Sequence, residues 1–268
     1  MTNSVDTLLD LANAKLNPPY DYEGALQLLE QAYSMAEASG DRLGKARILD
    51  MRGYALWCLG DFRLSLQCLK EALLLAQGVA YLEAFSLRKL GNTLQELGEY
   101  ESALEAYQQA LERHKSAGGG ATDEALILNK LALCLGRMGQ IEQALKTHDR
   151  ALKLAAKEIK TYLLSIRSLI LVMGGRAEAE EAWAAVQEAA TTLPQVQELT
   201  SLYFYYFACY KVLKAQGRRE EAREHLRKAY EIVYGEASRI RDERWRESFL
   251  RAAWPNREIV GEWEKIKR

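Results

Sequence analysis

Pairs of small residues seven positions apart recur six times along the 268-residue chain, and this repeat limits the folds open to it. A spacing of seven places both members of a pair on one face of a helix, because two turns of an α-helix take about seven residues. Successive pairs begin about 40 positions apart, at Ala25/Ala32, Ser65/Ala72, Ala103/Ala110, Ala144/Ala151, Ala182/Ala189 and Ala222/Ala229. Such a period predicts stacked copies of one structural unit.

A turn signal precedes most of these pairs, as in LGDFRLS at residues 59–65. Four glycines stand where an apolar segment with helical spacing ends, at Gly60, Gly98, Gly139 and Gly217. A left-handed residue commonly ends a helix at such a position. The fifth copy, GGRAEAEEA at residues 174–182, is looser. Each unit is therefore predicted to consist of a helix, a tight turn and a second helix.

Gly91 lies inside an apolar series with helical spacing, although glycine destabilises a helix interior by about 0.5–1 kcal/mol relative to alanine. We expect Gly91, Ala103 and Ala110 to lie where helices cross closely. The dispersion attraction between closely packed helices would offset the glycine penalty.

The third copy resembles the tetratricopeptide repeat through Leu87, Leu90, Gly91, Leu94, Ala103 and Tyr107. A repeat unit of about 40 residues is similar to the units of a tetratricopeptide-repeat subclass found in bacterial regulators and cell-polarity adaptors. The resemblance implies an all-α, right-handed superhelical solenoid of six helix-turn-helix repeats, with the first helices on its concave side. Residues 1–234 are expected to hold the repeats and residues 235–268 the C-terminal capping helices.

By analogy with this family, defined positions around the Gly91-type residue of each first helix face a groove. These positions predict a site for a peptide or partner protein at Tyr54, Trp57, Arg88, Lys89, Asn92, Asn129, Lys130, Arg167 and Lys211. Asparagine amides can pair with an extended peptide backbone, and basic side chains can hold carboxylates. The arrangement is similar to the carboxylate clamps of chaperone-binding members, which implies acidic groups on the partner. Two alternatives stay open: a basic face that is only solvated, and a Trp57 that only packs against a neighbouring helix end.

Three of the five tryptophans lie in the C-terminal segment after Gly235, at Trp245, Trp254 and Trp263. We expect a helix up to Ala253 and, after a break at Pro255, a short last helix. These helices would cap the open end of the solenoid; homodimerisation through the same aromatic residues is the alternative. The SFL and NREI stretches of this tail are similar to tails that close tetratricopeptide arms in large bacterial regulators.

Lysine and arginine number 36 and aspartate and glutamate 37, so the net charge of −1 gives no reason to expect binding to nucleic acid or to a membrane surface. The longest mostly apolar stretch, residues 162–175, is too short to span a bilayer. The N-terminus lacks the features of a signal peptide. We therefore expect a cytoplasmic protein whose four cysteines are reduced and buried.

No pattern of catalytic or metal-binding residues stands out. His114, His148 and His225 lie in different units without a companion at ligand spacing, and residues 118–120 lack the Lys-Ser or Lys-Thr of a phosphate-binding loop. We expect neither an enzyme nor a cofactor. The favoured function is a non-catalytic protein–protein interaction scaffold that binds a peptide or acidic partner segment in its concave groove. The alternative is a ligand- or peptide-sensing regulatory arm of a bacterial signalling or transcriptional regulator.

Overall fold

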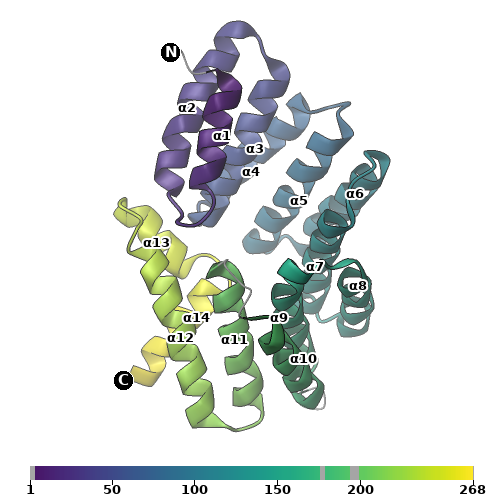
Figure 1. Cartoon of the computed structure of the whole chain (residues 1–268), viewed down its shortest axis with the longest axis vertical. Coiled ribbons are helices and arrows are strands. Elements are labelled where there is room, and N and C mark those ends of the chain that lie inside the picture. Colours follow the sequence, from purple (N-terminus) through teal and green to yellow (C-terminus); the bar gives the residue numbers. More distant parts are fainter. Residues whose placement is uncertain (1–3, 176–178, 194–198, 268) are drawn as a thin grey trace. The chain divides into compact units, whose positions relative to one another are not determined.

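The computed structural model describes residues 4–175, 179–193 and 199–267, and over these residues the chain is all-helical, with fourteen helices and no strand (Figure 1). This confirms the predicted all-α fold class, whereas the count of six repeats stays a prediction. None of the described helices is long and apolar enough to cross a membrane. The chain divides into two compact units: unit 1 comprises Met1–Gly119 and Glu236–Ala253, and unit 2 comprises Gly120–Gly235 and Trp254–Arg268. The expected boundary between repeats and cap after residue 234 stays a prediction.

Unit 1 is built from pairs of helices that follow one another along the chain. Its helices are α1 (Val5–Lys15), α2 (Tyr22–Ser39), α3 (Arg42–Cys58), α4 (Phe62–Leu75), α5 (Ala80–Leu97), α6 (Tyr100–Ser116) and α13 (Glu243–Arg251). The helices α1, α3 and α5 pack against α2, α4 and α6 respectively. Since α3 also contacts both α1 and α5, the first helices of successive pairs adjoin one another.

Unit 2 repeats this arrangement. Its helices are α7 (Ala121–Arg137), α8 (Ile141–Leu154), α9 (Lys157–Gly174), α10 (Ala179–Thr192), α11 (Leu199–Ala215), α12 (Arg219–Ala237, in unit 2 up to Gly235) and α14 (Asn256–Lys267). The helix α9 packs against α10 and contacts the first helices α7 and α11. The ammonium group of Lys228 lies 5.6 Å from the ring centroid of Tyr206, so α12 packs on α11.

All twelve small residues of the six pairs are buried, none of them more than 3% exposed. The gap at Gly91 has an identifiable occupant, because a Cβ there would lie only 2.6 Å from the ring of Tyr107. A Cβ at Gly53 would lie equally close to the side chain of Leu69. The expected close approach is therefore confirmed, and at both positions the space is filled by a side chain from the second helix of the same pair.

The four cysteines are free thiols, as expected, but they are not equally buried. Cys134 and Cys209 lie in the core of unit 2, whereas Cys58 and Cys68 are half-buried. The expectation of four buried thiols is therefore wrong for the two cysteines of unit 1. Cys58 is the last residue of α3, and Cys68 lies within α4.

The turns between the two helices of a pair also follow the prediction. Gly60, Gly98, Gly139 and Gly217 all have positive φ values, between 76° and 83°. After Gly98, the Glu99 N–H donates to the Leu94 carbonyl at 2.9 Å, which satisfies a carbonyl at the end of α5. Residues 176–178 of the looser fifth turn lie outside the described part of the chain.

The C-terminal segment breaks where Pro255 predicted, between α13 and α14. The helix expected up to Ala253 ends two residues earlier, since α13 covers Glu243–Arg251, and Ile240 lies between α12 and α13. Asp242 begins α13 by accepting the Trp245 N–H at 3.2 Å. The two tail helices belong to different units, α13 to unit 1 and α14 to unit 2.

Candidate partner-binding site

Five residues of α3 and α5 meet in unit 1, and we name them the α3–α5 cluster: Asp50, Tyr54, Trp57, Ser86 and Lys89. The rings of Tyr54 and Trp57 are stacked, with centroids 6.2 Å apart. The Lys89 ammonium lies 5.6 Å from the Tyr54 centroid and forms an ion pair with Asp50. The Ser86 hydroxyl donates to the second Asp50 oxygen at 3.0 Å. This cluster holds three of the nine predicted site residues.

Helical geometry explains why these side chains of α3 share a face. Residues 50, 54 and 57 follow the i, i+4, i+7 pattern, whereas Arg52 and Leu56 lie on the other side of the helix. The helix α3 begins at Asp41, whose carboxylate accepts the Gly44 N–H at 2.8 Å. The face is thus positioned by a capped helix.

The side chains of Lys89 and Asp50 are only 15% and 13% exposed, so little solvent reaches their charges. The charge of Lys89 is compensated by Asp50 instead. Arg88 differs from its neighbour on α5. It is half-buried, and no ion pair or hydrogen bond to another described residue engages it. Arg88 is therefore the predicted basic residue of unit 1 whose charge is available to a partner.

The two predicted amides are buried. Asn92 is 6% exposed, and its side-chain oxygen accepts a hydrogen bond from the Tyr107 hydroxyl at 2.9 Å. Asn129 on α7 is fully buried. Both amides are thus covered by neighbouring side chains in this structure, and their pairing with an extended peptide backbone stays a prediction.

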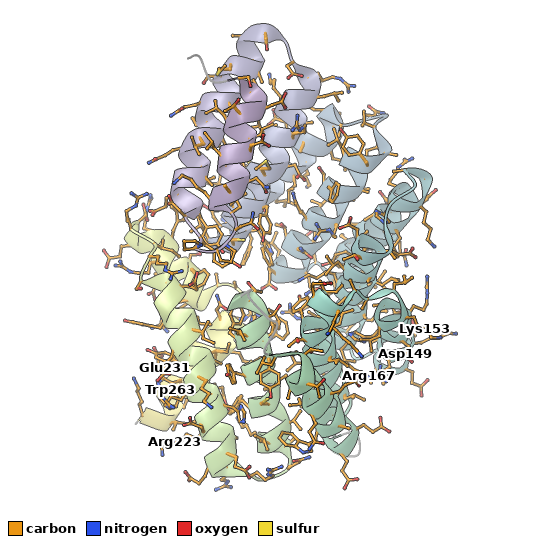
Figure 2. All side chains as sticks on the ribbon, viewed as in Figure 1. Asp149, Lys153, Arg167, Arg223, Glu231 and Trp263 are labelled. Carbon is orange, nitrogen blue, oxygen red and sulfur yellow. The ribbon has the colours of Figure 1, made fainter. Side chains whose placement is uncertain are left out.

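In unit 2, two predicted basic residues turn to partners on other helices. Lys130 donates to the Tyr162 hydroxyl at 2.8 Å. Arg167 forms an ion pair of 2.5 Å with Asp149 on α8, and Figure 2 shows the two side by side. Next to this pair, burial and then the Arg167 charge lower the pKa of His148 to about 4, so this histidine is neutral at pH 7.

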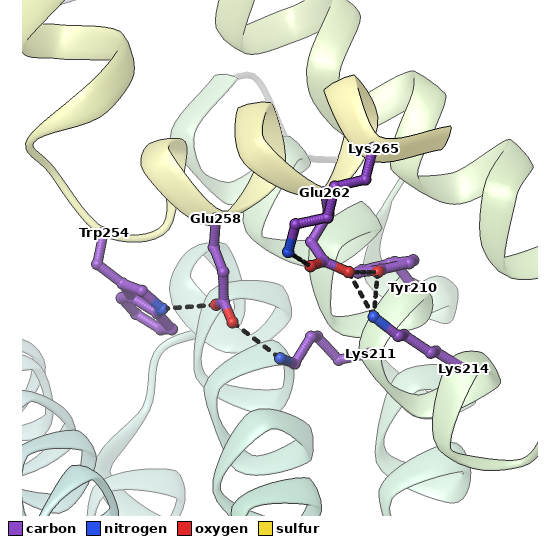
Figure 3. Close-up of polar contacts among 7 residues, drawn as sticks. All are labelled: Tyr210, Lys211, Lys214, Trp254, Glu258, Glu262 and Lys265. Carbon is purple, nitrogen blue, oxygen red and sulfur yellow. Dashed lines mark hydrogen bonds and ion pairs between the residues drawn. The ribbon is translucent and has the colours of Figure 1, made fainter. Parts of the chain in front are cut away.

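Lys211, the remaining predicted residue, belongs to a polar network between α11 and α14 (Figure 3). Its ammonium lies 3.0 Å from a Glu258 oxygen, and the other Glu258 oxygen accepts the Trp254 indole N–H at 3.1 Å. One turn further along α14, Glu262 accepts hydrogen bonds from Lys214 and Tyr210. The helix α11, the first of its pair, thus binds the carboxylates of Glu258 and Glu262 within the chain.

The protonation of this network follows from its contacts. Burial favours the neutral form of Glu262, but hydrogen bonds from Lys214, Lys265 and Tyr210 outweigh burial and lower its pKa to about 2. Burial, and then the hydrogen bond to Glu262, raise the pKa of Tyr210 to about 12. At neutral pH Glu262 is therefore ionised and pairs with the ammonium groups of Lys214 and Lys265.

The acidic partners Glu258 and Glu262 were not among the predicted site residues. Their spacing of four on a predicted helix matches the spacing of three between Lys211 and Lys214, since both spacings place side chains on one helix face. This match in spacing was the signal in the sequence that could have indicated Glu258 and Glu262 as partners of the two lysines. It does not reveal which two helices adjoin.

Residues 81–157 match the model of a family described as tetratricopeptide repeat. Among solved structures, the chain is similar to the apo form of RapI, with a TM-score of 0.68 and 13% identity over 88% of this chain and 85% of that one. It is also similar to BtubC (BKLC) from P. vanneervenii, with a TM-score of 0.57 and 17% identity over 86% and 91% of the two chains. For MamA (41-end) from Desulfovibrio magneticus RS-1 the values are 0.51 and 16%, over 74% and 99%. These identities show a shared fold alone, and no curated protein matches the sequence.

Proposed function

We propose that this chain, in which residues 81–157 match the tetratricopeptide repeat model, is a non-catalytic protein-interaction scaffold whose first helices in unit 1 bind an acidic segment of a partner. The binding residues are Arg88 together with the exposed parts of Tyr54 and Trp57. The partner supplies a carboxylate to Arg88 and apolar contact to the stacked rings. Tryptophan, tyrosine and arginine are the residue types that contribute most to binding at protein interfaces.

The observation that carries this proposal is the lack of an intramolecular partner for Arg88 among the described residues. Three other predicted basic residues are compensated, Lys89 by Asp50, Arg167 by Asp149 and Lys211 by Glu258. A guanidinium group can hold a carboxylate through two parallel hydrogen bonds. The free guanidinium group of Arg88 is therefore stronger support for an acidic partner than the number of basic residues on these helices.

The network of α11 and α14 supports the same chemistry. There, lysines of a first helix bind carboxylates spaced along a second helix, within one unit. This arrangement also favours the capping role expected for the tail, since Trp263 of α14 is 8% exposed. Because Trp263 is already buried within the chain, homodimerisation through the tail would have to use other residues.

The test compares the 268-residue chain with two variants, Arg88→Glu and Trp57→Ala. A partner is captured from native lysate on the wild type, and its dissociation constant for each variant is then measured. We expect about tenfold weaker binding to both, as for interface residues that contribute above 1 kcal/mol. Lys70→Glu is the matched control, because Lys70 is exposed on the second helix α4 and engages no described residue.

Equal affinities for all four proteins would contradict the proposed site. A chain that captures no protein but gains thermal stability with a small ligand would favour the regulatory-arm alternative, because a ligand that binds only the folded state stabilises it.

A further inference from the structure

The helix α13 is fixed to the first two helix pairs of unit 1 by specific polar contacts. Glu23 on α2 accepts the backbone N–H groups of Arg241 and Asp242, at 3.0 and 2.8 Å. The Ser248 hydroxyl donates to the Gly60 carbonyl at 3.0 Å. The fit at Gly60 is close, because a Cβ there would lie 2.8 Å from the Ser248 carbonyl oxygen. The position of α13 in unit 1 is therefore well defined.

With α13 in this place, two open cavities share Leu64 and Trp245 as lining residues. One cavity has a volume of about 400 Å³ and the other about 520 Å³. Leu64 is 45% exposed and Trp245 is half-buried, so both present apolar surface to a ligand. We name Leu64, Trp245 and the cavities beside them the Leu64–Trp245 surface.

This surface is distinct from the α3–α5 cluster. The residues of α3 that line the smaller cavity are Arg52 and Leu56, on the side of the helix turned away from Tyr54 and Trp57. A ligand at one site therefore leaves the other site accessible on α3.

The charges around the two cavities differ. In the smaller cavity Glu23 pairs with Arg241 and Glu30 with Arg52, each at 3.1 Å, and the third carboxylate, Asp242, accepts backbone N–H groups of α13. That cavity therefore has no strong preference for a charged ligand.

The larger cavity has an excess of available positive charge. Its acidic lining residue, Asp61, accepts the Leu64 N–H at 3.3 Å and begins α4. The Arg244 side chain is 89% exposed and forms an ion pair of 3.4 Å with Asp242. Arg63 is exposed and engages no other described residue. The guanidinium group of Arg63 is thus free to meet an anionic ligand, and that of Arg244 is accessible to the same ligand beside its ion pair with Asp242.

We propose that the Leu64–Trp245 surface is a second docking site, for an acidic peptide segment of a partner protein. Arg63 and Arg244 bind a carboxylate of this segment, and a large apolar side chain next to the carboxylate packs against Leu64 and Trp245. Cavities of this size are in the usual range for bound ligands, and a central tryptophan flanked by arginines is typical of the residues that dominate interfaces. Because Trp245 and Arg244 belong to α13, the site is complete only when α13 is docked.

The test selects peptides from a displayed library of random short sequences on the immobilised 268-residue chain. Selected peptides are then measured against the wild type, Trp245→Ala and Arg63→Glu. We expect the selected peptides to combine aspartate or glutamate with a large apolar residue, and both variants to weaken binding about tenfold or more. Added salt should weaken it further, because both guanidinium groups are exposed.

Two control variants make the result specific. Lys70→Glu introduces the same charge change on α4 and should leave the affinity unchanged, and so should Arg88→Glu at the other proposed site. Arg63→Glu alters an exposed residue, so the test does not depend on the folding of Trp245→Ala. The proposal is overturned if no peptide is selected, if the selected peptides lack carboxylates, or if Arg63→Glu and Trp245→Ala bind them as tightly as the wild type.

Discussion

The hydrogen atom that serves as the side chain of Gly91 makes room for the ring of Tyr107. That ring is fully buried, and its hydroxyl donates to the Asn92 amide. One glycine thus permits both the close packing of α5 on α6 and a buried hydrogen bond. Burial of an aromatic side chain stabilises a fold by more than the weak helix propensity of one glycine destabilises it.

Replacement of Gly91 tests this explanation. In Gly91→Ala the new methyl group would collide with the Tyr107 ring, and we expect the free energy of unfolding to fall by about 1–3 kcal/mol despite the better helix propensity of alanine. Gly235→Ala is the matched control, since a Cβ at this position in α12 meets no atom within 4 Å. The control should raise stability by up to about 1 kcal/mol. Urea denaturation measures both; an unchanged or raised stability of Gly91→Ala would contradict the close packing.

The sequence predicts single positions well where one residue type satisfies a local requirement. The left-handed turn glycines and the buried small pairs follow from helical spacing alone. Ion pairs such as Lys89 with Asp50 are different, because their partners lie 39 residues apart. Which long side chain meets which carboxylate depends on the packing of neighbouring helices. The predicted basic face therefore did not anticipate the compensation of Lys89, Arg167 and Lys211.

Among the helices, the two of the tail show how a short segment depends on its surroundings. The helix α13 has nine residues, too few to be stable alone in water. Its polar contacts with Glu23 and Gly60, and the buried Phe249, hold it in unit 1. The sequence predicted the break between the helices from Pro255. The carboxylate and carbonyl that receive α13 lie far earlier in the chain, on α2 and in the turn before α4, beyond the reach of any local pattern.

Alanine substitutions at two turn glycines distinguish the effect of the α13 contacts from the effect of backbone strain. Gly60 and Gly98 both have positive φ, so alanine at either position should destabilise the protein by about 1–2 kcal/mol. Only at Gly60 would the new Cβ also collide with Ser248 of α13. We therefore expect Gly60→Ala, but not Gly98→Ala, to increase amide hydrogen exchange in residues 243–251. Equal exchange of this segment in the two variants would contradict the described position of α13.

The helix α14 should respond to acid. The pKa of Glu262 is lowered to about 2 by Lys214, Lys265 and Tyr210, from an ordinary value of 4.5. Since the native state binds fewer protons here than the unfolded state, this contribution is fully present above pH 4.5 and is lost as the pH falls toward 2.

We therefore expect Glu262→Gln to destabilise the protein by about 1–2 kcal/mol at pH 7 and much less near pH 2. The free energy of unfolding measured at several pH values checks this. Glu105→Gln, at an exposed carboxylate of α6 without a described partner, should show no such difference. A Glu262→Gln effect that is constant with pH would contradict the ionised network.

For the molecule as a whole, the repeat period predicts the helix pairs and their order, and the structure confirms them over the described residues. The division into two units was not predicted, because the period continues through Gly119 and Gly120 without a break. The assignment of α13 to unit 1 and α14 to unit 2 also has no sequence signal, since both helices carry tryptophan and charged residues in similar proportion. The repeats thus predict the scaffold, whereas the surfaces that bind partners depend on contacts between elements.

If the scaffold binds an acidic partner segment through α3 and α5, these two helices should exchange their amide hydrogens more slowly in the complex. Hydrogen exchange of the 268-residue chain with and without a captured partner measures this. We expect increased protection in residues 42–58 and 80–97, and loss of this protection in Arg88→Glu. Protection confined to other helices, or protection that persists in Arg88→Glu, would contradict binding at this site.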